Sequence, residues 1–292
     1  MQRHRHLMFG MTLLMVLASS VSFADEGDTT TSIEEFIASL RTFYLQRAEA
    51  LRFSKPDSDK PFVLEKKPVL TWTSTGDGLW SGDVFVWAGD GRPEVIGCIG
   101  SWPIDEKTRG VFEEFHSLST GPLGETDLDE SLKWKSESPG VVMLDVPGAD
   151  VPASDGRKRL SQMRRLTDRF KAHMSINKAP EELRLLTQPL YRYSGRSSTI
   201  VDGGVFAYVT TAGTDPEVLL LLECHKEGDV QKWMYAPVRF THRELWLTLD
   251  DSEVWRVTNH NTPYRSSLIT DPYLSRPTEP VSIDDVKALK TK

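Results

Sequence analysis

Two stretches of the chain read almost alike, and both have the residue pattern of β-strands. The first, GDVFVWAGDGRPEVIGCI, begins at Gly82, and the second, GGVFAYVTTAGTDPEVLLLL, begins at Gly203. Each is rich in β-branched and aromatic residues and is interrupted by a turn that contains glycine and proline, as antiparallel hairpins are. The sequence therefore predicts two similar sets of antiparallel strands.

The likeness extends beyond these two stretches. When Pro68 is set against Pro189, the regions that follow align without a gap, and aromatic residues match one another, as Trp72 matches Tyr193. The matches occur in the same order along both regions, which indicates an internal duplication. The alternative is chance, since many soluble proteins contain two amphipathic strands of similar composition.

We expect an α+β fold that is internally duplicated, each half being a helix followed by a curved antiparallel sheet. The first unit spans 25–150, the second 151–270, and a C-terminal tail 271–292. Apolar stripes at helical spacing predict that helices begin near Ser32 and Asp155. The runs VFVW and EVLLLL are apolar on both faces, which is typical of strands that are covered on both sides. Each sheet is therefore predicted to lie between its own helix and the other sheet.

The first 24 residues have the features of a signal peptide. A basic start, MQRHRH, precedes the apolar run LMFGMTLLMVLA, and Ser22 and Ala24 are small residues at the positions that signal peptidase reads. The alternative is an uncleaved membrane anchor, but the apolar run is shorter than the roughly 20 residues that span a bilayer. We expect cleavage after Ala24 and export of a mature chain that has no transmembrane segment.

Charge and cysteine content limit the function further. The leader holds Arg3 and Arg5 and no acidic residue, so its removal changes the formal net charge from −7 to −9. This acidic balance argues against a nucleic-acid partner, which needs a cationic surface. Cys98 and Cys224 lie three residues apart in the aligned register, and strand side chains alternate between faces. We expect two buried free thiols; the alternative in an oxidising compartment is a disulfide between them.

Several longer strings resemble a known group of proteins. The string LRLLTQPLYRY, followed by TDPEVLLLLE, together with GRPEVIG and FHSLS in the first half, resembles a family of uncharacterised secreted bacterial proteins. The resemblance covers most of the mature chain. It implies an exported domain of full length, and it implies no activity, cofactor or catalytic residue.

The sequence lacks the motifs of several enzyme classes, among them Gly-x-Ser-x-Gly, His-Glu-x-x-His, Cys-x-x-Cys and the phosphate-binding loop of nucleotide hydrolases. No metal or cofactor site is predicted. The best acid–base candidates are Glu114 and His116, which share a face if EEFHS is a strand and can then exchange protons with a substrate. The alternative is a polar strand face without a catalytic role. Glu223 and His225 form a second pair of the same kind.

A basic segment, GRKRLSQMRRLTDRFK, stands out in the acidic chain. It places seven basic residues and one acidic residue between Arg157 and Lys171. We expect Arg157, Lys158, Arg164 and Arg165 to bind an anionic partner, which is an envelope polymer or an acidic protein. The alternative is a solvated helix face whose charges are balanced by nearby acids.

Aromatic residues are the last candidates. Tryptophan is concentrated in the first unit, at Trp72, Trp80, Trp87 and Trp102, and recurs in the second at Trp233, Trp246 and Trp255. Such residues line a pocket for an apolar or sugar ligand, or else they pack in the core. The sequence thus favours a non-catalytic binding or interaction module of the cell envelope. The alternatives are a hydrolase or isomerase that uses the Glu114–His116 face, and a carrier of an apolar small ligand between the halves.

Overall fold

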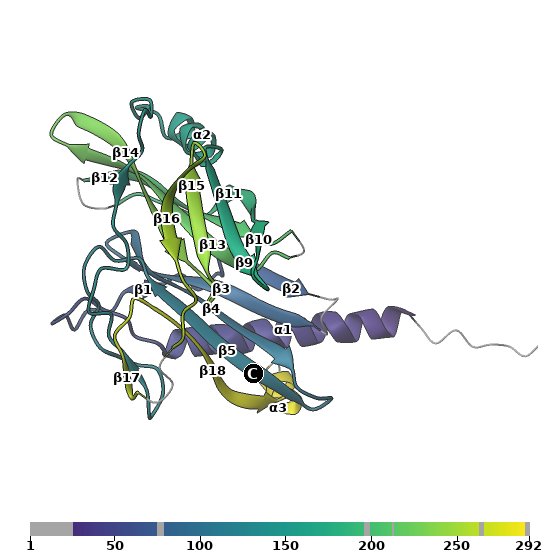
Figure 1. The fold of residues 1–292 in the computed structure, drawn as a ribbon. Helices are drawn as coiled ribbons and strands as arrows, with labels where there is room; N and C mark the ends of the chain where they lie inside the picture. The colour runs from purple at the N-terminus through teal and green to yellow at the C-terminus, as the bar shows by residue number, and fades with distance from the viewer. Residues whose placement is uncertain (1–25, 75–78, 196–198, 212, 263–265, 290–292) are drawn as a thin grey trace, which may run out of the picture.

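The computed structural model describes residues 26–74, 79–195, 199–211, 213–262 and 266–289. The predicted signal peptide therefore lies outside the described residues. Strands make up 50% of the structure and helices 15%, so the protein is mostly β. Figure 1 shows one large sheet with a long helix in the lower part of the molecule, and a second large sheet with a shorter helix in the upper part.

The first sheet has six strands and is antiparallel throughout. Its members are β1 (Val63–Leu64), β2 (Leu70–Ser74), β3 (Trp80–Gly89), β4 (Arg92–Pro103), β5 (Thr108–Ser117) and β18 (Tyr273–Ser282). The order is β1-β3-β4-β5-β18, and β2 also pairs with β3. The last strand of the chain thus forms one edge of this sheet.

The second sheet is also antiparallel and has the order β11-β12-β13-β14-β8. Its members are β8 (Leu144–Asp145), β11 (Arg184–Tyr193), β12 (Ile200–Val209), β13 (Pro216–Glu227) and β14 (Val230–Arg239). Two smaller sheets complete the fold, with orders β10-β9-β15-β16 and β17-β7-β6. Their members are β6 (Thr126–Asp127), β7 (Lys133–Trp134), β9 (Phe170–Ile176), β10 (Ala179–Glu182), β15 (Leu245–Leu249), β16 (Ser252–Val257) and β17 (Leu268–Ile269).

The three helices are α1 (Glu26–Ala50), α2 (Gly156–Thr167) and α3 (Ile283–Ala288). A stripe at four-residue spacing, Leu40, Tyr44 and Ala48, is buried on α1 and packs on the first sheet. The helix already includes Glu26, so it begins earlier than the capping pattern at Ser32 predicted. For α2 the prediction is confirmed: the Asp155 carboxylate caps the helix by accepting from two backbone N–H groups.

Three layers of apolar side chains hold these elements together. The inner faces of the two large sheets pack on each other through residues such as Val84 and Val205. On the outer faces, Phe85 lies with α1 and Phe206 lies with α2 and strands β9 and β15. Neighbouring residues of β3 and β12 thus enter different layers, because strand side chains alternate between faces. The prediction that VFVW and EVLLLL are covered on both sides is confirmed.

The predicted fold class, an α+β duplication of one helix and one sheet, is wrong. A third sheet, not α2 alone, covers much of the second sheet, because the 12 residues of α2 are too few to cover its outer face. The segment assigned to a C-terminal tail forms β18 and pairs with β5 of the first sheet. Conversely, β8 belongs to the predicted first unit in sequence but pairs with β14 of the second sheet.

What the two similar stretches share is local strand pairing. The segments β2–β5 and β11–β14 are both antiparallel meanders, and Val84 opposite Cys98 has its counterpart in Val205 opposite Leu221. Cys98 lies between the two large sheets, and Cys224 lies in the outer layer with α2. Both thiols are free, so the predicted absence of a disulfide is confirmed.

We expect Phe85→Ala and Phe206→Ala each to lower the free energy of unfolding by roughly 3–5 kcal/mol, because both side chains are fully buried and leave a cavity. Denaturant melts of the purified variants measure this loss. Val142→Ala is the control: Val142 is 68% exposed, so we expect a change of less than about 0.5 kcal/mol. A loss below about 1 kcal/mol at either phenylalanine would contradict the layered core.

Candidate functional site

Helix α2 carries the basic segment on the outer surface of the second sheet. Met163 and Leu166 are buried and fix the inner side of the helix against the sheet. Gln162 and Thr167 are buried as well, and the basic residues occupy the more exposed positions of the helix. The local pattern of sequence thus places the cations, but their partners come from elsewhere in the chain.

Four of the seven basic residues are already engaged. Arg159 donates to the Asp202 carboxylate at 2.9 Å, and Arg192 of β11 shares the same carboxylate. Arg164 donates to the side-chain oxygen of Gln188. The remaining two, beyond the helix end, form ion pairs with two aspartates of the β15–β16 turn: Arg169 with Asp250 and Lys171 with Asp251.

Arg157, Lys158 and Arg165 are different. All three are exposed, and within the described part of the chain none of their side chains has a hydrogen-bond or ion-pair partner. Lys158 and Arg165 are seven residues apart, about two helical turns, and therefore lie on the same side of α2. We call these three residues the open cation face. Of the four predicted binding residues, Arg164 alone lies outside it.

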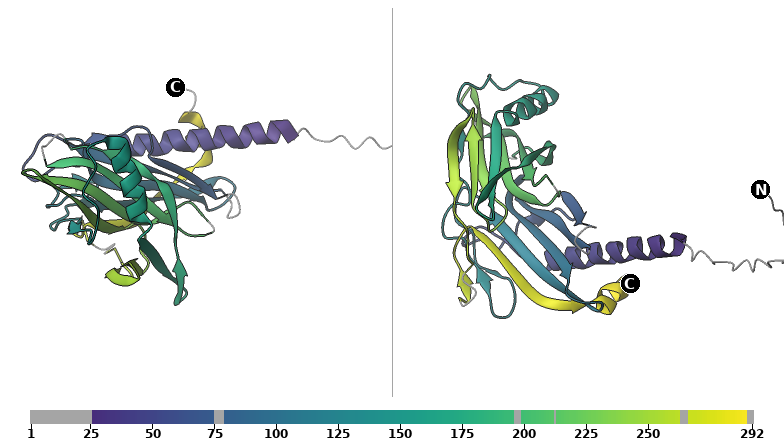
Figure 2. Two further views of the ribbon diagram at one scale, coloured as in Figure 1. Left: turned by 90° about the horizontal axis from the view of Figure 1, so that it is seen from above. Right: turned by 45° about the vertical axis from the view of Figure 1, so that its right-hand side comes forward.

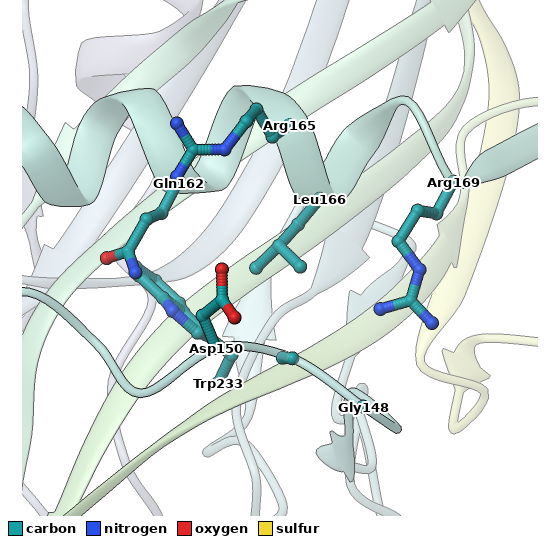
Figure 3. Close-up of a pocket in the computed structure, with 8 residues that line it drawn as sticks. Gly148, Asp150, Gln162, Arg165, Leu166, Arg169 and Trp233 are labelled. Atoms are coloured by element: carbon teal, nitrogen blue, oxygen red, sulfur yellow. The ribbon is translucent and has the colours of Figure 1, made fainter.

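A small pocket adjoins Arg165. Its volume is about 180 Å³, and Figure 3 shows the side chains around it. The lining residues are Gly148, Ala149, Asp150, Gln162, Arg165, Leu166, Arg169 and Trp233. The pocket lies between α2, the loop that precedes it and strand β14. At this size it holds a single small group, since sites for drug-sized ligands are usually larger than about 300 Å³.

Some polar groups of the pocket have hydrogen-bond or ion-pair partners and others do not. Hydrogen bonding to Arg169 lowers the pKa of Asp250, so the Arg169 charge is neutralised by that pair. The indole of Trp233 is 2% exposed, and its Nε1–H has no hydrogen-bond partner among the described residues. Arg165 and Asp150 both line the pocket, and neither has a hydrogen-bond or ion-pair partner among the described residues. The pocket therefore offers one free guanidinium and one carboxylate, while the Trp233 N–H is enclosed.

Glu114 and His116 lie elsewhere, on the inner face of the first sheet. They share a face as predicted, but both are at least nine-tenths buried, and they do not bond to each other. Glu114 accepts a hydrogen bond from Tyr273, and His116 Nδ1 lies 2.7 Å from the carbonyl oxygen of Ser117. Burial raises the pKa of Glu114 well above its usual value and lowers that of His116 to about 4. His116 is therefore neutral at neutral pH, and burial disfavours the charged form of Glu114.

Tyr273 is the centre of this buried cluster. Its ring contacts His116, the edge of His260 and the guanidinium of Arg239, at centroid separations of 5.9, 4.9 and 5.0 Å. These contacts tie β18 to β5 and to the end of β14. The cluster does not present a proton donor and acceptor to a substrate, as general acid–base catalysis requires.

Glu223 and His225, the second pair, do contact each other, at 2.5 Å. Glu223 also accepts hydrogen bonds from Arg92 of β4 and from Tyr193 of β11. Burial by itself would raise the pKa of Glu223, but the His225 hydrogen bond and the Arg92 charge more than offset it, so the pKa is lowered. The carboxylate is fully buried and links the two large sheets, which is a structural role.

Among the described residues, no group of three or more His, Cys, Asp or Glu side chains is placed to hold a metal ion. None of the three described helices is long and apolar enough to cross a membrane.

Sequence reasoning missed Asp150 and the role of Trp233 in the pocket. Asp150 lies in the loop before α2, and Trp233 lies on β14, 83 residues further along the chain. No spacing rule joins such positions, because β14 reaches the loop only through the pairing of β14 with β8. An exposed loop acid near a basic helix was the one available signal, and it is a weak one.

We expect Glu217→Gln to raise the melting temperature at pH 8 by a few degrees and to change it little at pH 5. Burial raises the pKa of Glu217 from 4.5 to about 7, against the opposing effect of a hydrogen bond with Thr241. The folded protein thus binds this proton more tightly than the unfolded chain does, and stability falls as the pH rises from about 4.5 through about 7.

Thermal melts at the two pH values measure this effect. Glu227→Gln is the control, because Glu227 lies at the exposed end of the same strand. An equal shift at both pH values for Glu217→Gln would show that the carboxyl is not buried as described.

No protein-family model, curated protein or solved structure matches the chain. The resemblance to uncharacterised secreted bacterial proteins is therefore still an expectation, and the geometry of the site carries the functional argument.

Proposed function

We propose that the protein is an exported, non-catalytic binding module that docks an anionic partner, an envelope polymer or an acidic protein, on α2. The observation that carries this proposal is the open cation face. Three neighbouring cations without partners are unusual on a chain whose net charge is −7, where acids are plentiful enough to pair them.

Charge complementarity supports a partner rather than solvent alone. The other basic residues of the segment are held by Asp202, Asp250, Asp251 and Gln188, so the helix surface is balanced everywhere except at the open cation face. A local positive region on an acidic molecule attracts anionic partners and repels positively charged ones. The proposal that the protein is exported rests on the sequence of its N-terminal segment, which lies outside the described residues.

The pocket supplies a place for one acidic group of the partner. Arg165 belongs both to the open cation face and to the pocket wall. A carboxylate or phosphate that enters beside Arg165 gains a charge-assisted hydrogen bond, which is stronger than a neutral one. Asp150 on the facing wall disfavours a second negative group close by.

The two alternatives have less support. A hydrolase or isomerase at Glu114 and His116 would need an accessible pair, and these side chains are buried and held by Tyr273 and Ser117. A carrier would need a cavity between the large sheets. In the described structure that space is filled by apolar side chains, among them Leu219, Leu221 and Phe240.

We expect the variant Arg157→Gln/Lys158→Gln/Arg165→Gln to lose retention on an immobilised polyglutamate or dextran sulfate matrix. The wild-type protein should be retained at low salt and released as the Debye length falls from about 10 Å at 0.1 M to about 3 Å at 1 M. Because the three residues are exposed, the melting temperature should stay nearly unchanged.

The matched control is Lys60→Gln/Lys66→Gln/Lys133→Gln, which removes the same charge from exposed positions away from α2. It should retain wild-type binding. Equal loss in both variants would show that only net charge matters, and absence of wild-type retention at low salt would leave the open cation face as a solvated surface. Either result would overturn the proposal.

A further inference from the structure

Four aromatic rings form a continuous row on the inner face of the first sheet. Trp80 stacks on Trp102 with ring centroids 5.6 Å apart and planes 24° apart. Phe112 follows Trp102 at 6.4 Å and 30°, and Trp72 follows Phe112 at the same separation and tilt. The rings come from β3, β4, β5 and β2, four strands that are neighbours in the order β2-β3-β4-β5. We call these four residues the aromatic row.

Glycines allow the rings to lie flat on the sheet. A Cβ atom at Gly110 would come within 2.3 Å of the Trp102 ring, and one at Gly100 within 2.4 Å of the Phe112 ring. At Gly82 it would meet the Trp72 ring at 2.9 Å. The rings of Trp102, Phe112 and Trp72 therefore each lie close to bare backbone, and Trp80 stacks on Trp102 at the end of the row.

One end of the row is buried and the other is open. Trp72 is 7% exposed and, with Phe112, packs in the core between the two large sheets. Trp102 is half-buried and Trp80 is 39% exposed, and neither belongs to that core. In Figure 1 the end of β4 and the start of β5 lie at the lower right, away from the strands of the second sheet, and the right-hand view of Figure 2 shows the same separation. The second sheet thus covers half of the row and leaves the stacked tryptophan pair accessible.

The exposed pair is not explained by packing. Large aromatic side chains contribute to stability by burial, and a stacked indole pair at the surface forgoes much of that gain. Trp87, by contrast, is 1% exposed in the core beneath α1. Flat, accessible rings held in a rigid row are pre-organised to stack on a flat ligand.

The charges around the open end select the kind of ligand. The row itself contains no cation, and the adjoining β4–β5 turn carries the exposed acids Asp105 and Glu106 beside Lys107. A single-stranded nucleic acid also stacks on aromatic rings, but it needs a positively charged groove for its backbone. A neutral sugar chain needs only ring faces for its C–H groups and a few hydrogen-bond partners for its hydroxyls.

We propose that the aromatic row is a binding site for a neutral polysaccharide, in which sugar rings stack on Trp80 and Trp102. The stacked pair is the exposed end of the row, so a sugar ring can reach its open face there. The site is independent of the open cation face, since it lies on the other large sheet and uses different chemistry.

The test is a binding titration of the full mature chain with neutral oligosaccharides: hexamers of β-1,4-glucose, β-1,3-glucose, α-1,4-glucose, β-1,4-xylose and N-acetylglucosamine. Tryptophan fluorescence and mobility in polysaccharide-containing native gels are the readouts. We expect at least one hexamer to bind and to change the indole emission. Trp80→Ala and Trp102→Ala should each weaken that binding by about tenfold or more, through loss of a stacked ring.

Two further variants separate binding from folding. Trp80→Phe keeps a stacking ring and should retain most of the affinity. Trp246→Ala is the control for loss of a tryptophan, because Trp246 stacks on His173 in the third sheet, outside the row. Failure of every hexamer to bind the wild-type protein would overturn the proposal. So would unchanged affinity in Trp80→Ala, or binding of single-stranded DNA that is lost in the same variants.

Discussion

The stacking of the two large sheets through their inner faces is the contact on which the rest of the molecule depends. Residues such as Val84 and Ile96 of the first sheet meet Val205 and Leu221 of the second, and each such side chain contributes about 1.5–3 kcal/mol when it is buried. Because strand side chains alternate, every inward residue has outward neighbours that need their own cover. The long helix on one side, and the short helix with the third sheet on the other, supply it.

The sequence predicted the parts of this arrangement that depend on neighbouring residues. Apolar character on both strand faces identified buried sheets, and alternation placed Cys98 and Cys224 in different layers. The fold class was wrong because the remaining pairings join distant segments. β18 is the clearest case, because Pro277 and Pro280 are unusual in a strand. Prolines are tolerated in an edge strand, where the backbone N–H groups on the outer side have no strand to donate to.

The candidate site shows the same division. Local composition identified the basic helix and its start near Asp155, which the structure shows to be the N-cap. The sequence did not predict which cations have no partner, because Asp202, Gln188 and Asp250 reach the helix from distant parts of the chain. Strand periodicity correctly placed Glu114 and His116 on one face. Both side chains are buried because other strands pack on that face, and the sequence of a single strand does not predict which strands those are.

The long edges of the two large sheets have a consequence for how this protein associates with others. An unpaired edge strand is a template for another chain, but β18 carries two prolines, and β11 loses its regular register between Leu186 and Tyr191, around Pro189. Both features hinder the addition of a further strand, which is a common route to aggregation. Association at these edges through backbone hydrogen bonds is therefore suppressed, and encounters are directed to side-chain surfaces. Contacts of that kind form and separate reversibly.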